Sequence, residues 1–241
     1  MTVVAFIPAR LASTRLACKP LVDISGKPMI QRVYERAIRA RSVSAVIVAT
    51  DDERIVDVVQ GFGGNVVMTS KAHVSGTDRV AEAAGKASAE IIVNLQGDEP
   101  MIEPEMIDAA VEPMLGDASI AICTLKTSIS TRAEFLNPNV VKVVTDRSGF
   151  ALYFSRSPIP CHASNNGGAL AYKHIGLYVY RKDFLLKFTA LKPAPLEMIE
   201  RLEQLRAIEN GFRIKVVETD KNPLSVDTPE DLEAVRRMFS A

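Results

Sequence analysis

The sequence predicts a three-layer α/β fold with a mainly parallel central sheet. Short β-branched runs are apolar at almost every position, as expected for strands that are buried on both faces. Segments with the helical spacing of apolar residues alternate with these runs through the first half of the chain. The chain has 241 residues, of which 47% are apolar, so it can form a sizeable core without disulfides.

Five strands are expected in the first half of the chain. The runs that predict them occupy residues 2–8, 44–50, 65–69, 90–96 and 119–125. Helices are predicted between the strands at residues 27–40, 52–64 and 78–87. In the first helix, Ile30, Val33 and Ala37 share one apolar stripe, which suits a helix lying on a sheet. Glycines at the end of the second are typical of a helix C-terminus.

The alternation ends near residue 138, where the pattern predicts a smaller β-rich excursion. Residues 139–160 indicate a hairpin that turns at 146–149, and a polar segment up to 171 predicts a loop. The remaining elements are expected at 174–181 (strand), 182–190 and 196–209 (helices), 213–219 (strand) and from 229 (helix). Because no repeat or linker divides the chain, we predict one domain, residues 1–241, with residues 139–180 as an inserted section.

The composition argues against several classes of partner. There are 29 Lys and Arg against 29 Asp and Glu, so no overall field attracts nucleic acid. Cys18, Cys123 and Cys161 lack the spacing of a zinc site or a disulfide framework, which predicts reduced thiols in a cytoplasmic protein. No segment approaches the roughly 20 apolar residues of a membrane span, and no basic leader is present. We therefore expect no membrane insertion and no export.

A cationic loop follows the first predicted strand. Arg10, Arg15 and Lys19 lie in "FIPARLASTRLACKPL", residues 6–21. Open α/β sheets bind ligands beyond the carboxyl ends of their strands, and these side chains are suited to phosphate oxygens. Residues 9–20 contain no glycine, which excludes a dinucleotide fingerprint, and no Walker motif is present. The loop predicts a polyphosphate site, with a solvated basic loop as the alternative.

Two acidic motifs are candidates for a metal site. "NLQGDEP", residues 94–100, puts Asp98 at the carboxyl edge of a strand, after a turn at Gly97. A carboxylate beside a polyphosphate indicates a divalent cation, and Mg²⁺ is the natural one. Helix capping is the alternative for Asp98 and the favoured interpretation for Glu99. In "SVDTPEDL", residues 225–232, helix initiation explains most residues and leaves Asp227 as a possible second ligand.

Taken together, these motifs resemble the 3-deoxy-manno-octulosonate cytidylyltransferase family over essentially the whole chain. The resemblance rests on "IPARLASTRLACKPL", "VATDDERI", "SGTDR", "VNLQGDEPMI", "NPNVVKVV", "ALYFSRSPIP", "HIGLYVYR", "PLEMIERLEQLRAIENG" and "VDTPEDLE", in family order. It implies a nucleotidyltransferase-like fold, usually a homodimer, with residues 139–180 contributing to the dimer and to sugar binding. It also implies transfer of CMP from CTP to a 3-deoxy sugar acid (Kdo), with Mg²⁺ and release of pyrophosphate, for lipopolysaccharide synthesis.

The resemblance also implies a role for each motif residue. The triphosphate would be held by Arg10, Arg15 and Lys19, and the cytosine and ribose would lie among Ser75, Gly76, Arg79 and Gln96. Mg²⁺ would be bound by Asp98 and Asp227, which form the catalytic set with Lys19. The sugar acid would lie near Arg156, His174, Tyr178, Glu203 and Gln204, with the Arg156 guanidinium suited to its carboxylate. Local sequence alone favours structural roles for His174 and Tyr178.

The first loop departs from the family pattern. Ala17 and Cys18 replace the proline and glycine that are usual there, and Leu11 replaces an aromatic residue. A positive φ at position 18 would strain a cysteine. Two alternatives remain: a cytidylyltransferase for an 8-amino analogue or a sialic acid, and a non-catalytic nucleotide-binding protein. The presence of Lys19 with both aspartates argues against the second.

Overall fold

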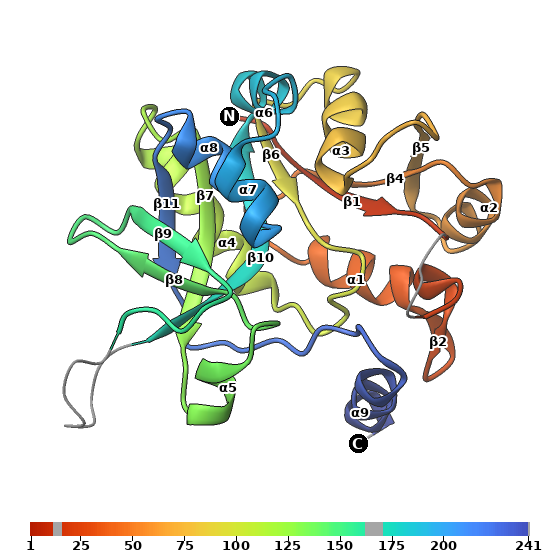
Figure 1. Cartoon of the computed structure of the whole chain (residues 1–241). Helices are drawn as coiled ribbons and strands as arrows, with labels where there is room; N and C mark the ends of the chain where they lie inside the picture. Colours follow the sequence, from red (N-terminus) through yellow and green to blue (C-terminus); the bar gives the residue numbers. More distant parts are fainter. Residues whose placement is uncertain (12–15, 162–170, 241) are drawn as a thin grey trace.

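The chain folds into three layers, with one sheet between two layers of helices (Figure 1). The computed structural model describes residues 1–11, 16–161 and 171–240. The main strands are β1 (Val3–Ala9), β4 (Ala45–Thr50), β5 (Asn65–Met68), β6 (Ile91–Asn94), β7 (Ile122–Ser128), β10 (Tyr172–Arg181) and β11 (Ile214–Glu218). Their order is β11-β7-β10-β6-β1-β4-β5. The predicted three-layer α/β fold is confirmed.

Among the seven main strands, β10 is the antiparallel one. Strands β6, β1, β4 and β5 pair in parallel, and so do β11 and β7. Strand β10 lies antiparallel between β6 and β7, with an irregular register between Ile175 and Tyr178. Because Tyr178 lies opposite Asn94, the last residue of β6, the first half of β10 extends beyond the carboxyl end of β6. It therefore borders the edge where ligands of such sheets bind.

The alternation of side chains along β1 separates two cores. Val3, Ala5 and Ile7 contact the helices of one face, whereas Val4 and Phe6 contact those of the other. The first face is covered by α1 (Met29–Ala37), α2 (Glu53–Gly61) and α4 (Pro104–Gly116). The second is covered by α3 (Gly76–Gly85), α6 (Lys182–Thr189) and α8 (Leu205–Glu209). A sheet that is buried on both faces explains the continuous apolar runs of the sequence.

Three helical features differ from the sequence prediction. Helix α4 is not predicted, because its two prolines obscure the helical pattern; Pro104 occupies the first turn and Pro113 the last. Helix α5 (Arg132–Leu136) is too short to leave a periodic signal. The single helix predicted over 196–209 is wrong: α7 (Pro195–Glu200) ends at Arg201, which has a φ of 54°, and α8 follows separately.

The predicted hairpin is confirmed. Strands β8 (Lys142–Thr145) and β9 (Ala151–Ser155) pair antiparallel, and β8 also pairs with the start of β10. The excursion is thus joined to the main sheet through β10. Most of the loop predicted after Pro160, residues 162–170, lies outside the described residues.

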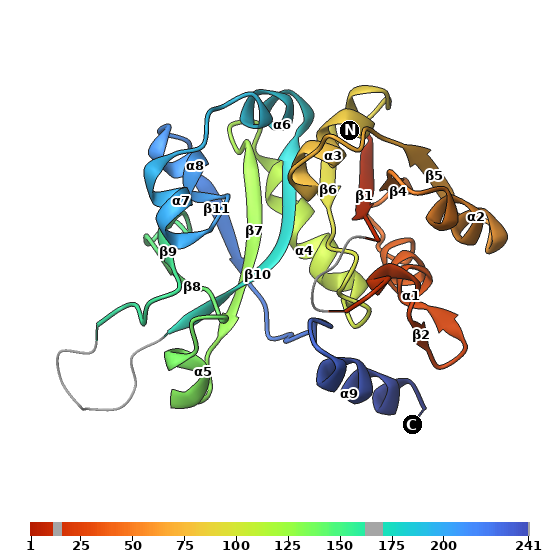
Figure 2. The same cartoon turned by 45° about the vertical axis from the view of Figure 1, so that its right-hand side comes forward.

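The C-terminal segment crosses back to the beginning of the chain. Helix α9 (Pro229–Ser240) lies beside β2 (Asp23–Ile24), which pairs with β3 (Lys27–Pro28) (Figure 2). Arg236 donates two hydrogen bonds to the Asp23 carbonyl, at 2.8 and 2.9 Å. Val226 and Leu232 pack with Ile24 in a small separate core. This crossing brings residues near 227 to the first loop.

In the described part of the chain, every helix is too short or too polar to cross a bilayer.

Candidate active site

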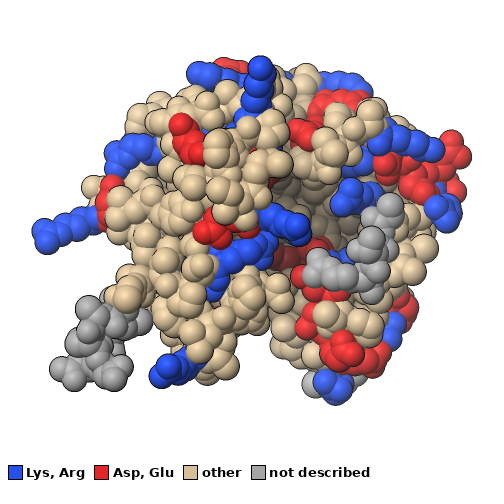
Figure 3. Space-filling view, viewed as in Figure 1, with Lys and Arg blue, Asp and Glu red and all other residues tan. Residues whose placement is uncertain are grey.

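A pocket of about 330 Å³ opens beyond the carboxyl ends of β1 and β6. It is lined by the loop after β1, the first turn of α3 and the loop after β6. Six of the seven predicted nucleotide residues lie in its wall: Arg10, Lys19, Ser75, Gly76, Arg79 and Gln96. The seventh, Arg15, lies outside the described residues. Basic and acidic side chains gather around a hollow on this face (Figure 3). The volume suits a small-molecule ligand.

The first loop turns at a residue with a left-handed backbone. Cys18 has φ 51° and ψ 35°, and it precedes the short 3₁₀ helix η1 (Lys19–Leu21). Position 18 therefore has the positive φ at which a cysteine strains the backbone. The turn is closed by a hydrogen bond from the Leu21 N–H to the Cys18 carbonyl, at 2.8 Å. This geometry directs Lys19 into the pocket, whereas Lys27 forms an ion pair with Glu35 at 2.7 Å.

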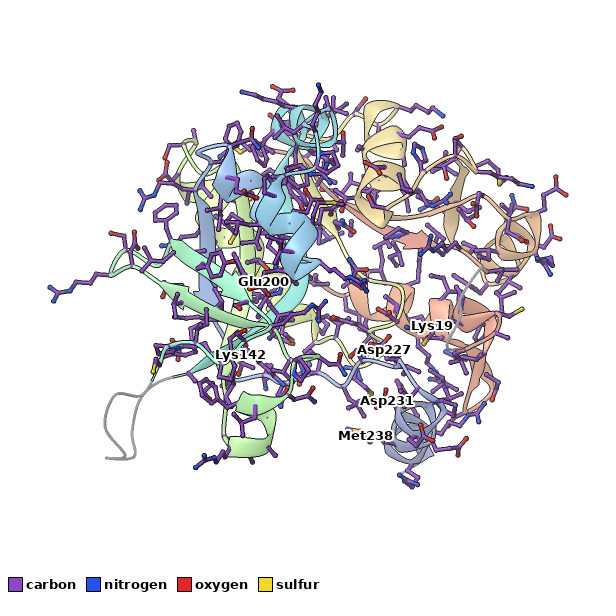
Figure 4. The ribbon with its side chains drawn as sticks, viewed as in Figure 1. Lys19, Lys142, Glu200, Asp227, Asp231 and Met238 are labelled. Atoms are coloured by element: carbon purple, nitrogen blue, oxygen red, sulfur yellow. The ribbon has the colours of Figure 1, made fainter. Side chains whose placement is uncertain are left out.

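Two carboxylates converge on the ammonium group of Lys19. Lys19 Nζ lies 2.6 Å from Asp98 Oδ2 and 2.9 Å from Asp227 Oδ1. The segments are joined by a hydrogen bond from the Val226 N–H to the Asp98 carbonyl, at 2.9 Å. Asp231 accepts the N–H groups of Asp227 and Thr228, so the start of α9 fixes this end of the site (Figure 4). The predicted metal ligands are therefore neighbours.

This pair of carboxylates fits a hard divalent cation. Both can reach one positive charge, and carboxylate oxygens are ligands that Mg²⁺ prefers. Among the described residues, no three His, Cys, Asp or Glu side chains gather around a single point, so other ligands would have to be phosphate oxygens and water. Two carboxylates are too few to enclose a metal ion, so the site suits a metal that is bound by the protein and the nucleotide together.

Glu99 lies beneath this site rather than at a helix end. The residue is 8% exposed, and its Oε2 atom has no hydrogen-bond partner in the described structure. Burial, with added repulsion from Asp98 and Asp227, raises the pKa of Glu99 to about 8. Glu103 precedes α4, so the expectation that Glu99 caps the following helix is wrong, and the same alternative for Asp98 is excluded.

Gly97 is required by close packing rather than by a turn with positive φ. A Cβ atom at this position would lie 3.1 Å from the Pro8 carbonyl oxygen of β1. The loop after β6 therefore passes directly beside the end of β1. This contact brings Gln96 and Asp98 next to the cationic loop, as the shared sheet edge predicted.

The first turn of α3 forms the nucleotide side of the pocket. Ser75 and Asp78 make a capping box, so the helix begins just at the pocket wall. Arg79 is 3% exposed; its guanidinium donates to Thr69 Oγ1 at 2.6 Å and to Asp51 Oδ2 at 2.9 Å. Arg79 therefore fastens α3 to the loops after β4 and β5. A ligand would meet its exposed edge and not a free guanidinium.

Two pocket residues were missed by the sequence reasoning. His73 and Val74 line the pocket just before α3, and Val74 is 86% exposed. His73 Nε2 lies 2.6 Å from Glu82 Oε2. Hydrogen bonds from Lys86, the Ser70 N–H and His73 lower the pKa of Glu82 to about 2. Of these residues, only the exposed apolar Val74 next to "SGTDR" could have served as a signal.

The predicted sugar-side residues lie mainly on the α3 side of the sheet. His174 and Tyr178 project from β10, where their rings are 5.3 Å apart. His174 Nε2 lies 2.9 Å from Thr124 Oγ1, and burial of the ring lowers the pKa of His174 to about 3, so the ring is neutral. Burial raises the pKa of Tyr178. Gln204 is 7% exposed, and Glu203 is bound by Thr77.

Arg156 belongs to a separate cluster that joins the excursion to α7. Its guanidinium donates to the carbonyls of Glu200 at 2.8 Å, Pro138 at 3.0 Å and Arg201 at 3.4 Å. Its N–H donates to Glu200 Oε2 at 2.9 Å. The structure does not place Arg156 among the pocket residues. Its predicted contact with the sugar carboxylate would require an exchange of partners.

Comparisons with known proteins agree on one family. A family model described as cytidylyltransferase matches residues 4–216. The 3-deoxy-manno-octulosonate cytidylyltransferases of Geobacter metallireducens and Geobacter sulfurreducens are 58% and 57% identical, over 100% and 98% of this chain and 98% of each relative. The solved structure of CMP:2-keto-3-deoxy-manno-octonic acid synthetase complexed with CTP matches 100% of this chain and 99% of its own, with a TM-score of 0.95 and 46% identity.

A more distant structure shares the fold alone. The 4-diphosphocytidyl-2C-methyl-D-erythritol synthase of Anaerococcus prevotii has a TM-score of 0.65 at 14% identity, over 100% of this chain and 99% of its own. At that identity, the similarity supports a shared arrangement of sheet and helices, but it says nothing about the substrate.

Proposed function

This chain belongs to the 3-deoxy-manno-octulosonate cytidylyltransferases, and we infer that it transfers CMP from CTP to the C2 hydroxyl of Kdo, releasing pyrophosphate. It is a nucleotidyltransferase. The observation that carries this conclusion is the convergence of Asp98 and Asp227 on Lys19 at the edge of a pocket walled by the predicted nucleotide residues. Nucleotide binding alone does not require two carboxylates beside a triphosphate.

The charges of the site explain how the reaction would proceed. The acceptor hydroxyl attacks the α-phosphorus of CTP in line with the leaving pyrophosphate, and both reactants are anions. Mg²⁺, held by Asp98 and Asp227, would supply positive charge that stabilises the leaving phosphates. Lys19 now neutralises the two carboxylates, and it would exchange them for phosphate oxygens when nucleotide and metal bind. Lys19 would therefore have partners both before nucleotide binds, when it pairs with the two aspartates, and afterwards, when it would bind phosphate.

The nucleotide residues divide into a triphosphate group and a nucleoside group. Arg10 and Lys19 enter the pocket from the loop after β1 and would bind the triphosphate, together with Arg15 of the same segment. Ser75, Gly76, Arg79 and Gln96 also line the pocket and would surround the ribose and cytosine. Gly76 lies so near β1 that an added Cβ would be 3.3 Å from Pro8. A larger side chain there would move the wall of the pocket.

The sugar acid would bind beyond the end of β6, at the first half of β10. Tyr178 OH is buried and lacks a partner among the described residues, so it is available to an acceptor hydroxyl. Glu203 would accept hydrogen bonds from sugar hydroxyls, Gln204 would accept or donate them, and neutral His174 would orient the hydroxyls. Arg156 would bind the sugar carboxylate if its guanidinium exchanged a backbone carbonyl for that stronger acceptor.

A homodimer in the cytoplasm, acting in lipopolysaccharide synthesis, completes the proposal. Exposed apolar side chains support an interface at the excursion: Leu152 on β9 is 60% exposed, and Met198 and Ile199 on α7 are 66% and 76% exposed. Strand β9 and α7 are neighbours, since Glu200 accepts a hydrogen bond from Ser155 at 2.6 Å. An apolar patch of this kind is expected to pair with another protein surface.

The function is tested by pyrophosphate release from CTP and Mg²⁺ with three acceptors offered separately. These are Kdo, its 8-amino analogue and N-acetylneuraminate. Release with Kdo that stops in EDTA and in Asp98→Ala is the expected result. Release of pyrophosphate only with another acceptor would show that this other sugar acid, and not Kdo, is the substrate. Binding of CTP without release from any acceptor would contradict the transferase.

A further inference from the structure

The predicted nucleotide and sugar sides are joined by a buried chain of hydrogen bonds. Asn94 Nδ2 donates to Thr77 Oγ1 at 3.4 Å, and Thr77 Oγ1 donates to Glu203 Oε2 at 2.5 Å. Thr77 is 5% exposed and Asn94 is 1% exposed. Thr77 and Asn94 were not among the predicted site residues. Their burial means that these bonds form within the protein and are not replaced by solvent.

Each member of the chain belongs to a different part of the site. Thr77 lies in the first turn of α3, next to Gly76 of the nucleotide pocket. Asn94 ends β6, from which the chain continues to Gln96 and Asp98. Glu203 comes from the link between α7 and α8. The hydroxyl of Thr77 therefore connects the nucleotide wall, the metal-side loop and the sugar side.

The hydrogen-bonding capacity of the groups fixes the direction of this chain. A hydroxyl has one proton and can accept further bonds, whereas an amide NH₂ can only donate. Thr77 therefore accepts from Asn94 and gives its single proton to Glu203. An ionised Glu203 receives a charge-assisted bond, which is the stronger kind.

Two other side chains lie near Glu203. The Ser75 hydroxyl also hydrogen-bonds to its carboxylate, from the same helix start as Thr77. Arg206 is 3.9 Å from Glu203 Oε1, but its guanidinium is turned toward Glu197, at 2.5 and 2.8 Å. Nearby, Asn94 Oδ1 and Tyr178 OH are buried without partners in the described structure, and the two residues lie opposite each other in the sheet. Side chains of opposite residues share one face. Asn94 Oδ1 and Tyr178 OH can therefore hydrogen-bond to a ligand that binds beside Glu203.

We infer that Thr77 is a positioning residue for the acceptor: its hydroxyl holds the Glu203 carboxylate ready for sugar hydroxyls and ties it to the helix turn that walls the nucleotide pocket. The inference rests on the proposed function, which gives Glu203 its role at the acceptor. Thr77 acts through Glu203 and does not touch the reacting atoms. Its loss should therefore weaken acceptor binding and leave CTP binding intact.

The test compares Thr77→Val, which keeps the shape but removes the hydroxyl, with Thr77→Ser, which keeps the hydroxyl. Thr189→Val is the matched control, since among the described residues its hydroxyl bonds only to carbonyls of its own helix, α6. We expect KM for Kdo to rise about tenfold or more in Thr77→Val, from loss of a bond to a charged group. The dissociation constant of CTP, measured by calorimetry, should stay within about twofold, and both Thr77→Ser and Thr189→Val should resemble wild type.

A double-mutant cycle separates positioning from a general structural effect. In a Glu203→Gln background, Thr77→Val should add less than about threefold to KM for Kdo, because the group it positions has already lost its charge. A normal KM for Kdo in Thr77→Val, or a full tenfold effect added to that of Glu203→Gln, would overturn the inference. Thermal unfolding checks the fold, and Thr77→Ala takes the place of the valine variant if that does not fold. Failure of the wild type to release pyrophosphate with Kdo would instead overturn the proposed function, and this inference with it.

Discussion

Two lysines of this protein occupy opposite kinds of environment. Lys142, in the excursion, is 0% exposed, and its ammonium donates to the carbonyls of Asn137, Val140 and Arg156 at 2.9, 2.7 and 2.6 Å. The ammonium of Lys19, by contrast, contacts two carboxylates at the edge of a pocket. Figure 4 shows the two lysines in separate parts of the molecule. All three protons of Lys142 are used by the backbone, whereas the partners of Lys19 are groups that a metal could take.

Two glutamates repeat the contrast. Glu200 accepts hydrogen bonds from Ser155 and the Arg156 N–H; burial alone would raise its pKa, but these bonds lower it. Glu99, beneath the metal-side loop, has an unpartnered oxygen, and burial raises its pKa to about 8. The excursion and α7 thus satisfy each other's polar groups and hold their shape. The pocket leaves polar groups for a ligand, and we expect mutations in the two regions to separate stability from turnover.

The largest effect should come from Asp98→Asn on the pocket side. The amide keeps the size of the side chain but removes a charge that would hold Mg²⁺, so we expect turnover to fall on the order of 100-fold or more. The melting temperature should change little, because Asp98 is partly exposed. Asp57→Asn, at an exposed position on α2, is the matched control and should keep wild-type turnover. Turnover within about fivefold of wild type in Asp98→Asn would contradict the proposed metal site.

On the excursion side, Lys142→Met should destabilise the protein. It removes the donor from three partly buried carbonyls, which we expect to lower the free energy of unfolding by roughly 3 kcal/mol. In a chain of this length the melting temperature would fall by about 6–12 °C. Lys192→Met, at an exposed lysine, controls for the loss of one charge. A Lys142→Met protein as stable as this control would show that the carbonyls find other donors.

The pH dependence of stability should reveal Glu200. Its folded-state pKa is lowered, so its contribution is present above the unfolded pKa near 4.5 and is lost as the pH falls through the folded value. At pH 6, wild type should therefore exceed Glu200→Gln by about 1 kcal/mol in unfolding free energy. The difference should close as the pH falls below 4.5 and through the lowered folded-state pKa. A difference that stays constant with pH would mean that Glu200 contributes by packing and not by charge.

The sequence predicted best those features that depend on neighbouring residues. Strands β1, β4 and β5 begin and end within about two residues of their predicted limits, since burial on both faces leaves a continuous apolar run. The position of Asp98 beside the first loop also follows from local order, because the carboxyl ends of parallel strands share one edge.

Features that depend on distant contacts could not be predicted in this way. Asp227 reaches Asp98 only because Val226 bonds to the Asp98 carbonyl after the C-terminal segment crosses the molecule. The burial of Lys142 was missed for a different reason: a lysine within "NVVKVV" suggests a side chain in solvent, and the sequence pattern does not show that three carbonyls of the hairpin and the segment before it converge on its ammonium. The bond between Thr77 and Glu203 likewise joins segments whose meeting no local pattern indicates.

The smallest predicted effect tests the strained turn of the pocket loop. Cys18 has a φ of 51°, where a side chain costs about 1–2 kcal/mol and glycine costs little. Cys18→Gly also adds about 0.5–1 kcal/mol of freedom to the unfolded chain, so a net gain of about 0.5–1 kcal/mol remains. We expect the melting temperature to rise by roughly 1–4 °C, as measured by calorimetry. Ala17→Gly, the neighbouring control at a residue without positive φ, should lower it instead. Equal shifts in both variants would show that the turn carries no strain and that the cysteine is accommodated by the loop.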